Sequence, residues 1–551
     1  ALLTLEISVN SSVLFSGNRI FAFADSKNTV DETDENNNIK HNMADCEFVP
    51  PTAGGFNPVP EWEWTGSKDI PTSNQVMCTP VVANLSDDNG DNMVDENDIP
   101  DIIFNSFIGL EARANGIIRA VSGDGSKEIF SVTEYKTYPL FTPAVGDIDR
   151  DGLPEVIALS EPVGNCPWGR NSCSFNVLAF ENDGSYKWTS DEIIIPESGY
   201  TASSITLSDI DEDGVPEIIV GNAVFDNKGK KKWVGTGGFG LGASCVANLD
   251  LEGYPEIIAG NTAYRANGEK YWSNASVGDG FTGIGNFDDD PNPEIVVVAE
   301  AEVYLLEHTG DIIWKVDLPG CSGICFGGSP AIADFDNDGK PEIGVSGRDK
   351  YTMFESDGTV VWSADINEDF IAITSSSVFD FEGDGSAEVV YSDVEKLIIL
   401  NGTDGKSHFD SDPVAVGGGT WSDMPIIADV DNDNNAEIIV VSSNWFGGPN
   451  NGIQVFGDAK DRWVNTRKIW NQYSYHITNV NDDGTIPRVE ANNWETFNNY
   501  RQNQMLNPFG CIDLTGSRVR ADKSGYPDSV KITARFGNGG ALHIAPGAAM
   551  S

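Results

Sequence analysis

Short apolar runs alternate with acidic loops along most of the chain. The recurring unit is an apolar run, an aspartate-rich loop, a Pro-Glu or Ala-Glu pair and a second apolar run, as in TLSDIDEDGVPEIIVGN from Thr206. Its eight copies begin their loops at positions 84, 147, 209, 248, 286, 334, 380 and 429. Later copies stand 38 to 49 residues apart, which is about the length of one four-stranded propeller blade. The spacing therefore predicts a β-propeller.

Each unit continues with a third apolar run, a tight turn and a fourth strand that ends in an aromatic residue, for example DGSYKW to Trp188. Asn-Gly and Asp-Gly between β-rich runs are hairpin signals, and helical periodicity is nearly absent. The predicted fold is all-β, an eight-bladed β-propeller, with a seven-bladed ring plus one divergent unit as the alternative.

The aromatic residues that end the fourth strands recur at one structural position. We therefore expect them to pack between neighbouring blades rather than to form sugar-stacking platforms. They are Phe130, Trp188, Trp233, Trp272, Trp314, Trp362, Phe409 and Trp463.

The acidic loops carry oxygen ligands at a spacing that suits calcium. In the loop from Asp209 to Glu217, carboxylates occupy positions 1, 3, 5 and 9, and Gly214 at position 6 permits the sharp turn. Calcium takes six to eight oxygen ligands, so alternate carboxylates on a tight loop can converge on one ion. The predicted ligands in loops of this type are Asp147, Asp149, Asp151 and Glu155; Asp209, Asp211, Asp213 and Glu217; Asp334, Asp336, Asp338 and Glu342; Asp380, Glu382, Asp384 and Glu388; and Asp429, Asp431, Asp433 and Glu437.

Three further loops depart from this pattern, and two of them offer a weaker set of calcium ligands. The weaker loops offer Asn248, Asp250, Glu252 and Glu256, and Asn286, Asp288, Asp290 and Glu294. The first loop has the EF-hand-like spacing 1, 3, 5, 9 and 12 in Asp87, Asn89, Asp91, Asp95 and Asp98. Several calcium ions, up to about eight, are expected in all. The alternative is a set of Asx-rich turns that satisfy their own backbone.

The charge of the chain agrees with cation binding. It has 85 acidic and 34 basic residues and a formal net charge of −51. Carboxylates clustered on one loop repel each other unless a cation is present. Such a surface also repels nucleic acid, so we expect no nucleic-acid partner, although adaptation to high salt would give the same composition. No apolar run approaches the ~20 residues of a membrane span.

The eight cysteines favour disulfides and an oxidising compartment. Cys166 and Cys173 flank a short loop, and Cys321 and Cys325 are close enough to pair. Zinc binding is the alternative, but no histidine stands beside either pair at finger spacing. We therefore expect a secreted, extracellular or cell-surface protein.

At the acidic loops the chain resembles the FG-GAP and VCBS repeat superfamily, the calcium-loop propellers that include the integrin α head. The resemblance spans residues 76–475. Residues 46–75 are expected to be a linker whose PEWEW run at 60–64 helps to close the ring, and residues 476–510 a clasp.

The two ends resemble parts of the cell-adhesion-related domain of bacteria (CARDB type), an immunoglobulin-like module. Residues 1–45, with FAFADSKNTVDETDENNN at 21–38, are similar to its second half, and residues 511–551, with CIDLTGSRVRADKSGYPDSVKITARFGNGG at 511–540, to its first half. Neither half closes a β-sandwich alone. The ends could meet as one domain, complete a neighbouring copy head to tail and so build a filament, or continue a tandem protein. We favour the head-to-tail or tandem linkage.

The function expected from these features is that of a non-enzymatic, calcium-binding structural or adhesive surface protein. Its expected partners are copies of itself, cell-surface glycans or matrix. One alternative is a lectin with Trp-rich loops at 165–173 and 444–450. Another is a rhamnogalacturonan-type polysaccharide lyase with His476 as its base. Residues 467–503 are interpreted as a structural clasp, and a ligand pocket of Arg467, Trp470, Tyr473 and His476 is the alternative.

Overall fold

The structure is a computed structural model. It describes residues 56–506, apart from 110, 165, 167–171, 197–203, 289, 323–324, 369–371, 412–422, 446–449 and 461, together with four short strands nearer the ends. The chain divides into two compact units, residues 53–504 and residues 1–52 with 505–551.

The larger unit contains eight antiparallel sheets of four or five strands, which confirms the predicted eight-bladed propeller. The first four blades are β5 (Val81–Ala83), β6 (Asp101–Ile108), β7 (Ile117–Ser122) and β8 (Glu128–Ser131); β9 (Ala144–Gly146), β10 (Glu155–Leu159), β12 (Val177–Phe180) and β13 (Tyr186–Thr189); β15 (Thr206–Ser208), β16 (Glu217–Val220), β17 (Ala223–Phe225) and β18 (Lys231–Val234); and β19 (Cys245–Ala247), β20 (Glu256–Ala259), β21 (Thr262–Tyr264) and β22 (Lys270–Ser273).

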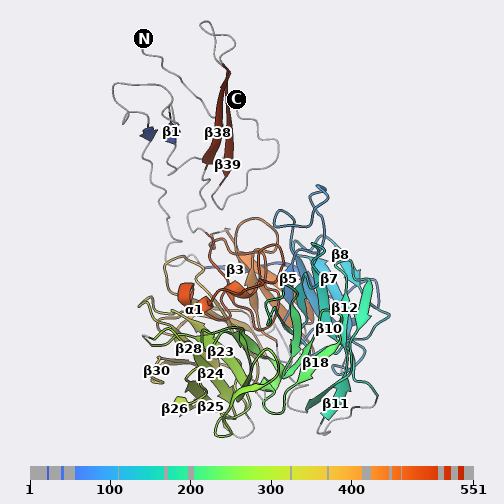
Figure 1. Cartoon of the computed structure of the whole chain (residues 1–551), viewed down its shortest axis with the longest axis vertical. Coiled ribbons are helices and arrows are strands. Elements are labelled where there is room, and N and C mark those ends of the chain that lie inside the picture. The colour runs from blue at the N-terminus through green and yellow to red at the C-terminus, as the bar shows by residue number, and fades with distance from the viewer. Residues whose placement is uncertain are drawn as a thin grey trace. The chain divides into compact units, whose positions relative to one another are not determined.

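The remaining four blades continue around the unit in chain order (Figure 1). They are β23 (Phe281–Gly285), β24 (Glu294–Ala299), β25 (Glu302–Leu306) and β26 (Ile312–Asp317); β27 (Ala331–Ala333), β28 (Glu342–Ser346), β29 (Lys350–Phe354) and β30 (Val360–Asp365); β31 (Ser377–Phe379), β32 (Glu388–Ser392), β33 (Leu397–Leu400) and β34 (Ser407–Asp410); and β35 (Ile426–Ala428), β36 (Glu437–Ser442), β37 (Gly452–Asp458) and β3 (Pro58–Trp64).

Three additions decorate this ring. Strand β4 (Ser73–Gln75) pairs with β6 and widens the first blade. Strands β11 (Ser172–Phe175) and β14 (Ile193–Pro196) form a separate two-stranded sheet inserted in the second blade. Helix α1 (Asn493–Thr496) is the α-helix of the described part of the chain, which confirms the near absence of helical periodicity.

The second strand of each blade is mostly apolar and buried because neighbouring blades cover both of its faces. Every residue of β10, β16, β24 and β36 is buried. The fourth strands lie at the outer edge and alternate between exposed and covered residues, as in β26 and β30. The core therefore follows the inner three strands of each blade.

The last blade takes its fourth strand from the N-terminal side of the propeller. Strand β3 pairs antiparallel with β37, so the strand expected at 60–64 closes the ring. The fourth strand predicted to end at Trp463 is therefore wrong, because β3 already occupies that edge. Trp463 instead lies outside the strands and packs on Phe381 and Phe56.

The aromatic residues of the fourth strands pack at the junctions between blades, as predicted. Trp314 Nε1 donates a hydrogen bond to the Ser356 carbonyl of the next blade, 2.8 Å away. In the last blade this role belongs to Trp62, whose Nε1 donates to the Gly123 carbonyl of the first blade at 2.8 Å. Equivalent bonds join Trp233 to Ala266, Trp272 to His308 and Trp362 to Gly402.

A hairpin glycine of the next blade rests on each of these rings, and its replacement tests the junction. Gly310 has φ +82°, and a Cβ there would lie 2.5 Å from the Trp272 ring. We expect Gly310→Ala to lower the free energy of unfolding by about 1 to 3 kcal/mol, because the ring is overpacked and the backbone strained. Gly339→Ala is the matched control, since Gly339 has φ +88° and open space around its Cβ. If denaturant unfolding shows equal losses of unfolding free energy in the two variants, the contact between Gly310 and the Trp272 ring does not stabilise the junction between blades.

Residues 464–504, here called the central segment, contact the inner strand or adjoining loop of every blade. Trp470 exchanges two backbone hydrogen bonds with Val82 of β5 at 2.8 and 2.9 Å, and Tyr500 exchanges two with Ile332 of β27. The other blades are reached through Val145, Leu207, Cys245, Asn286, Val378 and Asp429. The segment predicted as a clasp over the last blade therefore ties the whole ring together.

The smaller unit contains two described strand pairs. Strand β1 (Phe21–Phe23) pairs with β2 (Ile39–His41), and β38 (Leu514–Asp522) pairs with β39 (Lys531–Asn538). Among the described strands, none of the N-terminal pair is hydrogen-bonded to the C-terminal pair. The immunoglobulin-like nature of the ends and their linkage stay predictions.

Two predicted disulfides are present, Cys166–Cys173 and Cys321–Cys325. Cys78 and Cys245 are free and buried in the propeller. Over the residues described, no helix is long and apolar enough to cross a membrane.

Candidate metal centres in the acidic loops

Each acidic loop joins the innermost strand of a blade to its second strand. The glutamate at position 9 begins the second strand and is buried, and one of its oxygens accepts a hydrogen bond from the backbone N–H of position 2. Glu155 Oε2 accepts from Ile148 at 2.9 Å and Glu342 Oε2 from Phe335 at 2.8 Å. The same bond recurs at Glu217, Glu256, Glu294, Glu388 and Glu437.

The aspartate at position 1 also organises the loop. Asp380 accepts hydrogen bonds from the backbone N–H groups of Gly383 at 2.6 Å and Gly385 at 2.7 Å. Asp147, Asp209, Asp334 and Asp429 do the same in their loops. The loops are therefore Asx-rich turns, as the alternative interpretation expects. A carboxylate offers about four lone-pair sites, more than these bonds use, so this role is compatible with a metal.

The loops bring several of the predicted ligands together. The groups of predicted ligands whose carboxylate oxygens lie within 4.8 Å of one another include Asp147, Asp149 and Glu155; Asp209, Asp211 and Glu217; and Asp288, Asp290 and Glu294. The last group belongs to one of the two loops predicted to be weaker, in which Pro291 replaces the glycine at position 6. The proline therefore does not keep these three carboxylates apart.

Basic side chains enter the carboxylate clusters of the second, third and fourth blades. Lys187 Nζ lies 2.7 Å from Asp149 and 3.0 Å from Glu155. Lys232 Nζ lies 2.7 Å from Asp211 and 2.8 Å from Glu217. These lysines were not predicted from the sequence, although each stands directly before the aromatic residue of its fourth strand.

The fourth blade uses an arginine in the same way. Arg265 Nη1 lies 2.8 Å from Asp250 and also contacts Glu256, and its guanidinium stacks 4.1 Å above the ring of Tyr271. Of the other two predicted ligands in this loop, Glu252 is exposed and Asn248 is half-buried. This loop was predicted to be one of the two weaker ones, and Arg265 occupies its Asp250 and Glu256 carboxylates.

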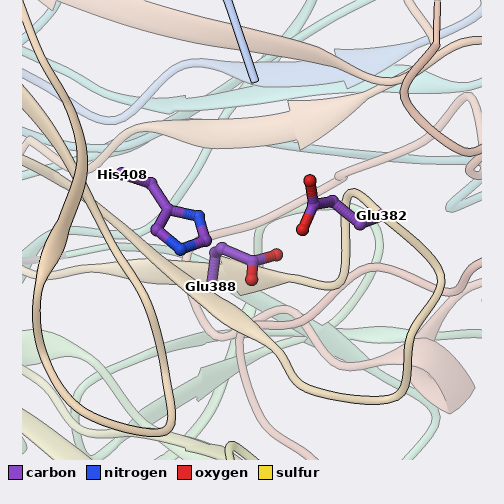
Figure 2. Close-up of side chains that lie close together, drawn as sticks. All are labelled: Glu382, Glu388 and His408. Carbon is purple, nitrogen blue, oxygen red and sulfur yellow. The ribbon is translucent and has the colours of Figure 1, made fainter. Parts of the chain in front are cut away.

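The seventh blade has a histidine at the place of these lysines. Figure 2 shows the His408 ring facing the carboxylates of Glu382 and Glu388, and ligand atoms of the three lie within 4.8 Å of one another. Asn401 Nδ2 lies 3.1 Å from His408 Nε2, which fixes the ring. His408 is a further residue that was not predicted from the sequence.

In the first loop, the residue predicted at position 12 organises the loop backbone. Asp98 accepts backbone hydrogen bonds from Asp88, Asn89 and Asp95, so it ties the loop together from within. The counterpart of the position 9 glutamates is Asp101, which opens β6, is buried and accepts from the Leu85 N–H at 2.9 Å. The Pro100-Asp101 pair, which parallels the Pro-Glu pairs elsewhere, was the signal for this missed residue.

Burial sets the electrostatics of the clusters. Desolvation, together with Asp336 and Asp334 nearby, raises the pKa of Glu342 to about 8. The same cause, helped by Asp288 and Asp290, raises the pKa of Glu294 to about 7. Burial beside neighbouring aspartates places the pKa of Glu388 and of Glu437 well above the usual range. Glu155 and Glu217, which contact lysines, are also raised to about 7, so burial is the main cause of the raised pKa throughout the position 9 glutamates.

The pocket interpretation finds little support in the contacts of its residues. Arg467 donates to the carbonyls of Ile477 and Val480 and contacts Asp482, while Trp470 and Tyr473 are buried in the core. Three of the four proposed pocket residues thus serve the central segment. The Trp-rich loops at 165–173 and 444–450 lie largely outside the described residues.

Comparisons with known proteins support the fold. The model of an FG-GAP-like repeat matches residues 147–220, which cover the second blade and the start of the third. The crystal structure of the V. cholerae biofilm matrix protein Bap1 is similar with TM-score 0.71 at 22% identity, covering 82% of this chain and 99% of that one. No curated protein sequence matches the chain.

Two lyase structures are also similar. An exotype rhamnogalacturonan lyase, YesX, has TM-score 0.47 at 17% identity over 73% of this chain and 75% of that one. A Bacillus licheniformis rhamnogalacturonan lyase has TM-score 0.44 at 17% identity over 77% of each chain.

Proposed function

We propose that this chain is an extracellular structural or adhesive protein whose propeller is stabilised by calcium bound in its acidic loops. The observation that carries the proposal is the recurrence of buried, converging carboxylates at the same place in successive blades. Calcium takes oxygen ligands in flexible geometry and suits loops that offer carboxylates and backbone carbonyls. When bound, it would supply a positive charge beside buried glutamates such as Glu294 and Glu342, which form no ion pair with a described lysine or arginine.

The donor set fits such an ion. Asp288, Asp290 and Glu294 offer three carboxylates, and Glu294 Oε1 is buried without a hydrogen-bond partner. A buried carboxylate oxygen with no partner is costly, and a cation is one way to satisfy it. Magnesium suits the loops less well, because it keeps its waters and demands octahedral geometry.

Two observations support an extracellular location. The disulfides Cys166–Cys173 and Cys321–Cys325 are typical of oxidising compartments. The fold is shared with a protein named for the biofilm matrix.

The adhesive role is tested by coating beads with the purified chain and counting their attachment to biofilm matrix and to glycan arrays. Attachment no greater than that of an unrelated acidic protein would contradict it.

We further propose that the chain is not an enzyme. The base expected of a lyase, His476, contacts Glu490 through Nε2 and lies 3.2 Å from the Ser474 carbonyl through Nδ1, so both nitrogens have internal partners. Pectic-sugar cleavage that is lost in His476→Ala would overturn this part of the proposal.

The head-to-tail linkage is tested by sedimentation of the full chain, which should form concentration-dependent oligomers.

The raised pKa values predict how pH acts on the metal-free protein. The folded-state pKa of Glu342, about 8, lies above the ordinary value of 4.5, so the folded state holds more protons than the unfolded state between these values. Stability without metal should therefore fall as pH rises from about 5 to about 8. Melting temperatures in EDTA across this range check the prediction, and calcium should flatten the profile. Stability that rises with pH in EDTA would contradict it.

A further inference from the structure

A β-bulge occurs at the same place in all eight blades, directly before the aromatic residue of the fourth strand. The register shifts between Ala179 and Phe180 in the second blade, which leaves Lys187 as the extra residue, and equivalent shifts occur in the others. Bulges re-aim side chains. The residues at this position, here called bulge residues, are Ile129, Lys187, Lys232, Tyr271, Ile313, Val361, His408 and Glu61.

In the second and third blades the bulge residue brings a cation between two loop carboxylates. Each lysine Nζ lies within 3.0 Å of both the position 3 aspartate and the position 9 glutamate of its own blade. In the fourth blade Tyr271 is the bulge residue and supports Arg265, whose Nη1 contacts the same two positions. Three consecutive blades thus place a positive charge at one equivalent point.

The fifth and sixth blades have apolar bulge residues, Ile313 and Val361, both exposed. Among the described residues, no lysine or arginine forms an ion pair with the loop carboxylates of these two blades. Glu294 is 1% exposed, and its Oε1 has no hydrogen-bond partner. A carboxylate oxygen of Glu294 lies within 4.8 Å of carboxylate oxygens of Asp288 and Asp290. In the fifth and sixth blades, therefore, no described lysine or arginine lies at the point that such a side chain occupies in the second, third and fourth blades.

We propose that the bulge position decides which loops bind calcium. The second, third and fourth blades carry their own cation and bind no metal, whereas the fifth and sixth blades bind calcium at the equivalent point. This inference rests on the proposed function, because it assigns the calcium ions to particular loops.

Mutual exclusion follows from charge and space. An ammonium within 3.0 Å of two carboxylates occupies the place that a calcium ion would take, since calcium–oxygen distances are about 2.3 to 2.6 Å. Two cations at one point would also repel each other strongly in a partly buried site. A single bulge residue is therefore enough to allow or prevent calcium binding in the loop of its blade.

The test exchanges the bulge residues in both directions and counts bound calcium. Val361→Lys should bind one ion fewer than the unmodified chain, and Lys232→Met should bind one more. The matched controls change the preceding residue of the same strand, Val360→Lys and Lys231→Met, and should leave the count unchanged. Val360 is 49% exposed and Val361 38% exposed, so both positions accommodate lysine.

The readout is calorimetric titration of EDTA-stripped protein with CaCl₂, supported by metal analysis after gel filtration. Circular dichroism establishes that each variant is folded, and the gain of a site in Lys232→Met cannot arise from misfolding. If the unmodified chain binds calcium but the counts of Val361→Lys and Lys232→Met do not change, the assignment to blades is overturned and the proposed function stands. If the unmodified chain binds no calcium, both are overturned.

Discussion

Replacing Trp470 with alanine is expected to lower the free energy of unfolding by about 3 to 5 kcal/mol, the usual range for a large aromatic residue removed from a core. Trp470 is 0% exposed and is among the largest fully buried side chains of the protein. Its ring stacks on Tyr475 at 4.4 Å, and its backbone pairs with Val82 of the first blade. Truncation would leave a cavity where the central segment meets the inner strands.

Urea unfolding followed by circular dichroism measures this loss. Trp470→Phe should lose less, because it keeps most of the ring contacts. Trp188→Ala serves as the comparison on an outer strand of the propeller, where the tryptophan side chain is only half-buried. A loss in Trp470→Ala no larger than that in Trp188→Ala would contradict the view that the central segment holds the blades together.

Removal of calcium is the second change with a large expected effect. One site with free calcium at 100 times its Kd stabilises the folded state by about 2.7 kcal/mol, so two sites contribute about 5 kcal/mol. Adding EDTA should therefore lower the melting temperature sharply, and excess CaCl₂ should restore it. Buried glutamates such as Glu294 would otherwise face neighbouring carboxylates without a counter-charge.

High salt separates this account from adaptation to a saline environment. Sodium chloride screens exposed charges over the whole surface, but it acts less on buried clusters. If 2 M NaCl restores the melting temperature in EDTA as fully as millimolar CaCl₂ does, general screening explains the acidity and specific sites do not. We expect only partial recovery from NaCl.

The blades could be predicted from sequence because each has its own local signals. The apolar second strand, the hairpin glycine and the fourth-strand aromatic lie close together in the chain, as in the unit that ends at Trp314. The ring closure by β3 was expected at 60–64, but Trp463 was placed in a competing fourth strand. That error arose because the last blade is completed by residues about 400 positions away, for which local pattern gives no evidence.

The site was predicted only in part, for a related reason. Loop carboxylates such as Asp209 and Glu217 are close in sequence, and their spacing shows that they converge. The cations that face them come from another strand, and only the bulge in register directs Lys232 into the cluster. A lysine before a tryptophan on an outer strand otherwise looks like an ordinary exposed residue. His408 was missed for the same reason.

The most direct test of the account is the calcium content of the purified full chain after gel filtration in buffer with micromolar free calcium. Three of the eight blades carry an internal cation, so at least two and at most five calcium ions per chain are expected. A count of eight would contradict the role of the basic side chains. A count of zero would contradict calcium binding itself and leave the acidic loops as self-satisfied turns.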